Sequence, residues 1–395
     1  MARRSRWCRS GMRPLRFPAR SSSTSSRTAS AACLPTFQTT PRKRGTDMTF
    51  EMSRRGFLAS VSSAAGLALL PRGAFAADEL VAATFGGTWA NVQKQILAPY
   101  FTKRTGASVV QSPMLATEQI AKLTAAKGNQ PPFDVAMLDE GPALEAIDAG
   151  LIAKYDPAKS PNFAALNPQF QGAYGPAITM QAIGIAYNPK TVKTPPTSWG
   201  DLWKPEFKGR VGITSLASTL GLAFLLDINR LAGGTEANME PGFKKLRTLL
   251  PNLAAVSANF GAHGALFQQG EIDIGVQNFN FAEELKAKGV PIEFVRVSTG
   301  TPAWKTTMHV VAGALKPDLA YAYVDSQISP DVQGEMQKSP WNVIPTSSKV
   351  PYGGLVAEKI AKSPADLDKM VFFDWKVVNQ NRAAWTQQFN RDIRV

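Results

Sequence analysis

Short apolar runs alternate along most of the chain with segments whose apolar residues recur at helical spacing. The apolar runs predict strands over Leu80–Thr84, Ala107–Gln111, Phe133–Leu138, Ile178–Tyr187, Arg210–Ile213, Ile272–Val276, Ile292–Val297 and Thr307–Ala312. The helical spacing predicts helices over Trp89–Lys103, Glu118–Lys127, Pro142–Ala149, Thr219–Leu231, Pro241–Leu250 and Phe279–Lys288. This alternation predicts an α/β fold with parallel sheets, in which ligand sites lie at the carboxyl ends of strands.

The segment before residue 77 has the pattern of an export signal. Arg54 and Arg55 precede the apolar stretch Phe57–Leu70, and small residues follow at Ala74–Ala76. Twin arginines in this position are typical of a Tat address, and the apolar stretch is shorter than the ~20 residues that span a bilayer. We therefore predict a Tat-type signal peptide over 52–76, cleaved after Ala76 to release the protein into the periplasm. A single membrane anchor is the alternative.

Residues 1–51 are rich in Arg, Ser and Pro and show no apolar periodicity, so they cannot bury a core. We expect a disordered or mis-called N-terminal extension, with the true start at Met48 or Met52. A mitochondrial-type presequence is the alternative.

The basic character of the chain is confined to this leader. Residues 1–76 hold 14 of the 44 basic and 2 of the 30 acidic residues, so the remainder carries 30 and 28, a net charge of +2. The pI of about 9.8 therefore gives no reason to expect a nucleic-acid partner. Cys8 and Cys33 also lie in the leader, so the exported domain has no disulfide, thiol nucleophile or lipid-carrying cysteine.

The motifs of common enzyme classes are missing from the sequence. His263 and His309 stand apart without H-E-x-x-H, which gives no zinc ligand set, and neither G-x-S-x-G nor the phosphate-binding G-x-x-x-x-G-K occurs. We expect His263 to lie at a helix start and His309 to be a hydrogen-bonded core residue. Tyr321 and Tyr323 lack the carboxylate partners of a ferric-ion site. We predict a protein that is no enzyme and has no cofactor or metal.

The glycine pair in "TFGGTW", Thr84–Trp89, follows the first predicted strand and opens a helix. Glycines there let the backbone approach a ligand, and the helix start offers free N–H groups. The segment is not G-x-G-x-x-G, so it does not indicate a dinucleotide site. Trp89 is either a ligand contact or a packed core residue.

The segment "SWGDLWKPEFKGRVGIT", Ser198–Thr214, closely resembles the S-W-x-D-L-W-K-P-E-[FY]-K-G signature of the spermidine/putrescine-type periplasmic binding proteins that feed ABC importers. Other segments agree with that family in order and spacing, among them "FGGTW", "FDVAML", "AIGIAYNP", "PNLAAVSANFGAHGALFQQGEIDIGVQN", "PAWKTTMHVV" and "ALKPDLAYAYVDSQISPDVQ". The resemblance covers essentially the whole chain after residue 76.

The resemblance implies a two-lobed periplasmic-binding-protein fold of type II, whose lobes are joined by two crossings and close on a small-molecule solute. We place the crossings near Ile183–Ala186 and Thr306–His309. We expect lobe one over 77–184 plus 307–345, and lobe two over 185–306 plus 346–395. A pattern over Pro364–Phe389 predicts a packing helix. The partners implied are the solute and the ABC permease subunits, with the binding protein itself a monomer.

In the family, aromatic side chains and carboxylates in the cleft hold the ammonium groups of a polyamine. Trp304 occupies the position of one such aromatic and should share a strand face with Thr306, while Lys305 points away. Thr306 replaces a family aspartate, and Ser215, Leu216 and Thr219 lie where the polyamine clamp has acidic residues. Gln277 or Asn278 replaces a further aromatic. The expected solute contacts are Trp89, Asp139, Glu140, Ser215, Ser218, Gln277, Asn278, Trp304 and Thr306.

These replacements favour a smaller solute with one amine, such as an amino acid, an amino-acid derivative or an opine-like compound. Asp139 and Glu140 would receive the amine, and Ser215, Ser218, Gln277 and Asn278 would hydrogen-bond a carboxylate, hydroxyl or amide. Asp139 has a second interpretation as the cap of the helix near Pro142. An accessory binding protein of a chemoreceptor would share the same fold.

Overall fold

The computed structural model describes residues 78–394, all of which belong to one compact unit, Leu70–Val395. The predicted extension over 1–51, the signal peptide over 52–76 and the cleavage point after Ala76 lie outside the described residues. Among the described residues, no helix is long and apolar enough to cross a membrane.

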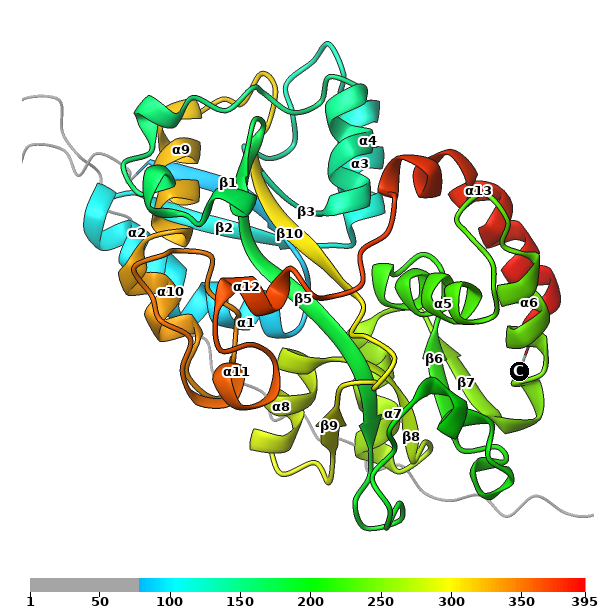
Figure 1. Ribbon diagram of the computed structural model, residues 1–395. Coiled ribbons are helices and arrows are strands. Elements are labelled where there is room, and N and C mark those ends of the chain that lie inside the picture. The colour runs from blue at the N-terminus through cyan, green and yellow to red at the C-terminus, as the bar shows by residue number, and fades with distance from the viewer. Residues whose placement is uncertain (1–77, 395) are drawn as a thin grey trace, which may run out of the picture. The chain divides into compact units, whose positions relative to one another are not determined.

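The sheet of the first lobe has the strand order β2-β1-β3-β10-β5 (Figure 1). Its strands are β1 Glu79–Thr84, β2 Ser108–Pro113, β3 Val135–Asp139, β5 Gly175–Tyr187 and β10 Ala303–Val310, with the short β4 Gln171–Gly172 beside the start of β5. β1 is parallel to β2 and β3, whereas β10 is antiparallel to β3 and β5. Every residue of β3 is buried, which explains why its sequence is an unbroken apolar run ending in Asp139.

The sheet of the second lobe continues from β5 in the order β8-β6-β7, and β9 also pairs with β5. Its strands are β6 Val211–Thr214, β7 Leu253–Ser257, β8 Ile274–Asn278 and β9 Glu293–Val295. β6 is parallel to both β7 and β8, so the carboxyl ends of β6 and β8 lie at the same edge.

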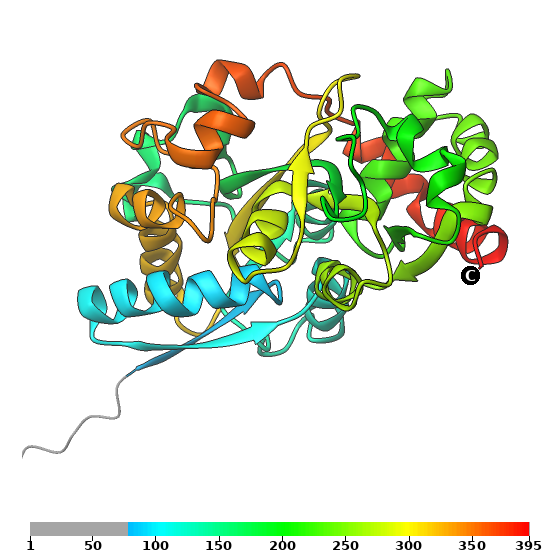
Figure 2. The ribbon, with the colours of Figure 1, turned by 90° about the horizontal axis from the view of Figure 1, so that it is seen from below.

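Helices cover both sheets (Figures 1 and 2). Those of the N-terminal part are α1 Thr88–Val92, α2 Ala98–Thr105, α3 Ala116–Ala125 and α4 Glu140–Asp148. The middle of the chain forms α5 Thr219–Leu231, α6 Glu240–Arg247, α7 Phe260–Gln269 and α8 Phe279–Ala287. The C-terminal part forms α9 Pro317–Gln327, α10 Pro330–Met336, α11 Gly354–Lys359, α12 Pro364–Leu367 and α13 Trp375–Asp392.

Two strands connect the lobes. The first half of β5 pairs with β10 up to Ala182, and its second half pairs with β8 and β9 from Ile183 onward. β10 pairs with β5 over Ala303–Thr307 and with β3 over Thr306–Val310. A third segment lies beside the start of β10. Val371 forms a β-bridge with Pro302 and exchanges backbone hydrogen bonds with Thr301 and Ala303, and the chain then enters α13.

The buried apolar side chains form two clusters. One is built mainly on the first sheet and the other surrounds β6, α5 and α13. Val356 of α11, Ile360 just after it and Leu367 of α12 belong to the first cluster, whereas Val378 and Trp385 of α13 belong to the second. The first cluster also contains Phe279, Leu285 and Phe294 of α8 and β9, so the lobe boundaries stay a prediction.

The predicted helix over Trp89–Lys103 is interrupted. A π-helical turn, Gln93–Leu97, separates α1 from α2. Pro99 stands at the second position of α2, and proline has no N–H to donate to the preceding turn, so the bonding pattern shifts there. The predicted packing helix near the C-terminus is likewise divided into α12 and α13.

Candidate functional site

Asp139 is the last residue of β3 and lies directly before α4, facing the second lobe. Its side chain is 3% exposed. Thr306 of β10 donates a hydrogen bond to Asp139 Oδ1 at 2.9 Å, and Thr219 at the start of α5 donates to Oδ2 at 2.6 Å. The Thr219 contact joins the two lobes. The carboxylate makes no capping hydrogen bond to α4, so the capping interpretation of Asp139 is wrong for its side chain.

The environment of Asp139 differs from that of the other buried carboxylates among residues 78–394. Most of those have a cationic partner, as in the pairs Asp227–Arg230 at 2.8 Å, Asp325–Arg104 at 2.6 Å, Glu283–Lys359 at 2.6 Å and Glu284–Lys288 at 2.5 Å. Asp134 instead accepts backbone N–H groups of Val81 and Lys316. The groups beside the Asp139 carboxylate are neutral donors, namely the hydroxyls of Thr219 and Thr306 and the indole N–H of Trp304.

Burial raises the pKa of Asp139, because desolvation disfavours the charged form. Hydrogen bonding to Thr219, Trp304 and Thr306 and the positive charge of Arg382 act in the opposite direction. A buried carboxylate held in this way is suited to accept an ammonium group, whose charge compensates the cost of burial.

Trp304 and Thr306 lie on the buried face of β10, and Lys305 between them is half-exposed, in agreement with strand alternation. The Trp304 indole is fully buried. Its N–H group faces the Asp139 carboxylate and helps to lower the pKa of that group, without forming a hydrogen bond of normal geometry. Glu140 is half-buried and accepts the Lys305 backbone N–H at 3.3 Å, with the Lys305 ammonium 3.9 Å away. The charge of Glu140 is therefore already compensated within the protein.

The predicted polar contacts of the second lobe gather at the carboxyl ends of β6 and β8. Ser215 follows β6 and is half-buried, and Ser218 is the buried N-cap residue of α5. Gln277 Oε1 accepts the backbone N–H of Asn278 at 2.9 Å, and Asn278 Nδ2 donates to Gln181 of β5 at 2.9 Å. The structure thus brings four predicted residues together on one side of the cleft.

Several buried polar atoms at this edge have no hydrogen-bond partner within the described residues. They are Thr214 Oγ1, Ser218 Oγ, Gln277 Nε2, Asn278 Oδ1 and Trp304 Nε1. An unsatisfied buried polar group costs about 1–3 kcal/mol, so clusters of them need an explanation. A bound polar solute would supply the missing partners.

Two cavities are lined by residues of both lobes. One of about 260 Å³ lies between Phe85–Gly87 and Pro113–Leu115 of the first lobe and Asn259–Gly261 of the second. The other, of about 930 Å³, lies between α3 and α4 on one side and Ala217 and α13 on the other. Neither cavity is lined by Asp139, Gln277 or Asn278.

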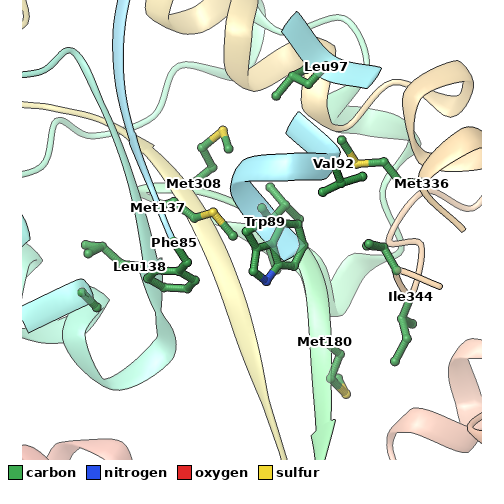
Figure 3. Close-up of a cluster of buried hydrophobic side chains, with 14 of the residues drawn as sticks. Phe85, Trp89, Val92, Leu97, Met137, Leu138, Met180, Met308, Met336 and Ile344 are labelled. Atoms are coloured by element: carbon green, nitrogen blue, oxygen red, sulfur yellow. The ribbon is translucent and has the colours of Figure 1, made fainter. Parts of the chain in front are cut away.

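Trp89 lies in an apolar cluster with Phe85, Met137 and Met308 (Figure 3). Its side chain is 3% exposed. This position is explained by core packing, with the polarisable methionine sulfurs filling the space around the aromatic ring. Contact between Trp89 and a solute stays a prediction.

The two histidines are both core residues. His309 is buried and both ring nitrogens are bonded, to Tyr174 O at 2.8 Å and Thr307 Oγ1 at 2.6 Å, as expected. His263 lies in the first turn of α7, as expected, and is fully buried with Nδ1 2.9 Å from Ser257 Oγ, while Asn259 is the residue that caps the helix. Burial lowers the pKa of each histidine to about 4.

Three residues near Asp139 and Asn278 were not among the predicted contacts. Gln181 binds Asn278, Thr219 binds Asp139, and the Arg382 charge acts on Asp139. Gln181 could have been found as the single amide within the apolar β5 run. Arg382 carries no such signal, because it belongs to a helix whose pattern indicates packing.

Residues 130–381 match the family described as bacterial extracellular solute-binding protein, and the chain belongs to that family. It is the solute-binding, non-enzymatic component of an ABC transporter, which implies a solute ligand and permease partners.

Individual relatives agree with this class. The spermidine/putrescine-binding periplasmic protein of Salmonella typhimurium is 26% identical over 310 residues, which cover 74% of this chain and 83% of that protein. The crystal structure of an ABC transporter from Clostridium perfringens is 28% identical, with a TM-score of 0.62 and coverage of 80% and 100%. AgtB of A. tumefaciens R10, in complex with agropinic acid, is 19% identical with a TM-score of 0.67 and coverage of 80% and 98%. The predicted two-lobed type II fold is confirmed.

Proposed function

We propose that this chain captures one small organic solute that carries a single amine and a hydrogen-bond acceptor, and delivers it to the permease of its transporter. Amino acids, amino-acid derivatives and opine-like compounds have this chemistry. The scaffold is of the polyamine-binding type, but the polar groups of the cleft are those expected for a ligand with both donors and acceptors.

The observation that carries the proposal is the buried, hydroxyl-bonded carboxylate of Asp139. An ammonium group placed beside it would add a charge-assisted hydrogen bond and offset the desolvation of the carboxylate. The Thr219 hydroxyl occupies one carboxylate oxygen at 2.6 Å, so a solute would replace or share this interlobe contact.

Gln277 supplies the evidence for an acceptor on the solute. Its Nε2 is an unambiguous donor without a partner, because its Oε1 already accepts the Asn278 backbone N–H. A fully protonated polyamine offers donors alone and would leave this N–H group unsatisfied, at about 1–3 kcal/mol. A carboxylate, hydroxyl or amide oxygen would satisfy it.

A second ammonium would find little compensation in the cleft. Glu140 is near Lys305, and Ser215 and Thr306 stand where the polyamine-binding pattern has acidic residues. The Salmonella relative is nevertheless named for spermidine and putrescine, so a polyamine is the second candidate. AgtB, of the same fold, was determined with agropinic acid, which shows that the fold accepts ligands outside the polyamines.

The transport cycle we propose uses closure of the lobes. Asp139 belongs to the first lobe, while Ser218, Gln277 and Asn278 belong to the second, so a solute between them would bind both and favour the closed state. We further propose Tat export, cleavage after Ala76 and action as a periplasmic monomer. An uptake assay of a deletion strain would separate transport from an accessory role in chemoreception.

A thermal-shift panel tests the chemistry of the solute. The matched pair is 4-aminobutyrate and putrescine, which share a four-carbon chain and differ in one terminal group. Amino acids, opines and spermidine complete the set, with sulfate, phosphate and ferric citrate as controls. A ligand at 100 times its Kd stabilises the protein by about 2.7 kcal/mol, which is readily measured. Stabilisation by putrescine or spermidine alone would contradict the proposal.

A further inference from the structure

Helix α13 is the C-terminal helix and contacts both lobes. Its apolar side chains Val378, Trp385 and Phe389 belong to the cluster around α5, so the helix packs as part of the second lobe. Its N-terminal half also lies against α4 of the first lobe (Figure 1). The polar residues on this half are not explained by packing of α13 on its own lobe.

The contact with the first lobe is made by Asn379 and Trp375. Asn379 Nδ2 donates a hydrogen bond to Gly141 O, in the first turn of α4, at 2.7 Å. The indole of Trp375 lies so close that a Cβ added to Gly141 would be 2.6 Å from Trp375 Cε3. Only glycine at position 141 permits this approach of α13 to α4.

The contact with the second lobe is made by Arg382, three residues further along the same helix. Arg382 Nη2 donates to Leu216 O at 3.2 Å and to Ala217 O at 3.0 Å, in the loop that leads into α5. Residues three apart on a helix share a face, so Asn379 and Arg382 lie side by side. One binds the first lobe and the other binds the second.

These two contacts flank the interlobe hydrogen bond at the candidate site. Gly141 follows Asp139 by two residues, and Ala217 precedes Thr219 by two residues. We propose that α13 is a closing latch, in which Asn379 fastens the second lobe to Gly141 while Arg382 fixes the loop that presents Thr219 to Asp139. Asn379 and Arg382 act as positioning residues, and the latch operates whatever solute the cleft holds.

Opening of the lobes must break the Asn379–Gly141 bond, because its two ends belong to different lobes. Loss of a neutral hydrogen bond changes an equilibrium constant about 2- to 10-fold. Removal of the Asn379 donor should therefore raise the ratio of open to closed protein by this factor. A solute that binds the closed state would lose affinity by up to the same factor without losing any contact of its own.

The latch is tested by measuring lobe separation in the ligand-free protein. With Cys8→Ser and Cys33→Ser, the chain has no native thiol, so Lys122→Cys on α3 and Lys244→Cys on α6 provide one label in each lobe. Single-molecule energy transfer between these exposed positions reports the open and closed populations. Asn379→Ala removes the hydrogen bond, and Gly141→Ala inserts a methyl group against Trp375. Both should shift the protein toward the longer separation.

The matched control is Asn390→Ala, the same substitution at an exposed position of α13. It should leave the distance distribution unchanged. Gly141→Ala is informative about folding as well, because alanine is a better helix former than glycine in α4, so a shift toward the open state cannot be attributed to a weakened helix. Unchanged separations in both Asn379→Ala and Gly141→Ala, with helical content retained by circular dichroism, would overturn the latch.

Discussion

Replacing Asp139 by Asn separates the binding role of the carboxylate from its structural role. The asparagine keeps the shape of the side chain. Its Oδ1 can accept from one of the two threonine hydroxyls, and its amide group can donate to the oxygen of the other, so the contacts to Thr219 and Thr306 can be retained. What is lost is the negative charge beside the proposed ammonium site.

The expected loss of affinity follows from the kind of interaction removed. A hydrogen bond to a charged group contributes about 1.5–3 kcal/mol, so Asp139→Asn should raise the Kd for an amine-containing solute about 10- to 150-fold. Isothermal titration calorimetry with the best ligand of the thermal-shift panel measures this directly. Glu140→Gln is the matched control, since Glu140 is near Lys305, and it should change the Kd much less.

The pH dependence provides an independent check of the same reasoning. Burial raises the pKa of Asp139 in the folded protein, so its contribution to stability is present at acid pH and is lost as the pH rises through the folded pKa. The ligand-free Asp139→Asn variant should therefore gain stability relative to the wild type on going from pH 4 to pH 7. Wild-type affinity should fall on acidification, because the ammonium needs an ionised carboxylate.

Two results would refute this account. If Asp139→Asn binds the solute as tightly as the wild type, Asp139 is not the acceptor of the amine. If the ligand-free variant instead loses stability relative to the wild type between pH 4 and pH 7, the fold favours the charged carboxylate, and burial of its charge is compensated within the protein. Urea unfolding of both proteins at each pH distinguishes these cases.

Other substitutions test the packing around the site. Trp89→Ala should destabilise the protein by about 3–5 kcal/mol in urea unfolding, as expected for a large aromatic removed from a core, and a loss below 1 kcal/mol would contradict its buried position. Gly221→Ala places a Cβ 2.3 Å from Thr214 O, so the start of α5 must shift and both stability and solute affinity should fall; unchanged values would disprove the close approach. The pKa values of about 4 for buried His263 and His309 predict that stability is lost as the pH falls from 6.5 toward 4, and His263→Gln should reduce this slope.

The elements were predictable where burial leaves a clear pattern. β3 and β5 are buried along their whole length, so their sequences are apolar runs, and α5 occupies the predicted range Thr219–Leu231. β7 was missed because the small residues of "LAAVS" weaken its apolar pattern. α7 was missed because its two glycines weaken the helical pattern. The π-helical turn before α2 was also missed. The apolar spacing is regular there, and only the missing N–H group of Pro99 indicates a change in the bonding pattern.

The candidate site was predictable in part for a similar reason. Asp139 was found because it ends a predicted strand, whereas Ser218, Gln277 and Asn278 were named from positions matched to the family that the sequence resembles. Their partners could not be found in this way. The Asp139 side chain turns toward Thr219, 80 residues away in the chain, rather than toward its own helix, and only the packing of the two lobes determines that choice.

The strand shared by both sheets has a thermodynamic consequence for the whole binding unit. β5 pairs with β10 through its first half and with β8 and β9 through its second, so neither sheet is complete without it. Unfolding of either lobe would remove hydrogen-bond partners from β5, which the sheet of the other lobe also requires. The two hydrophobic clusters should consequently melt together in a single calorimetric transition, and a solute bound in the cleft should stabilise both at once.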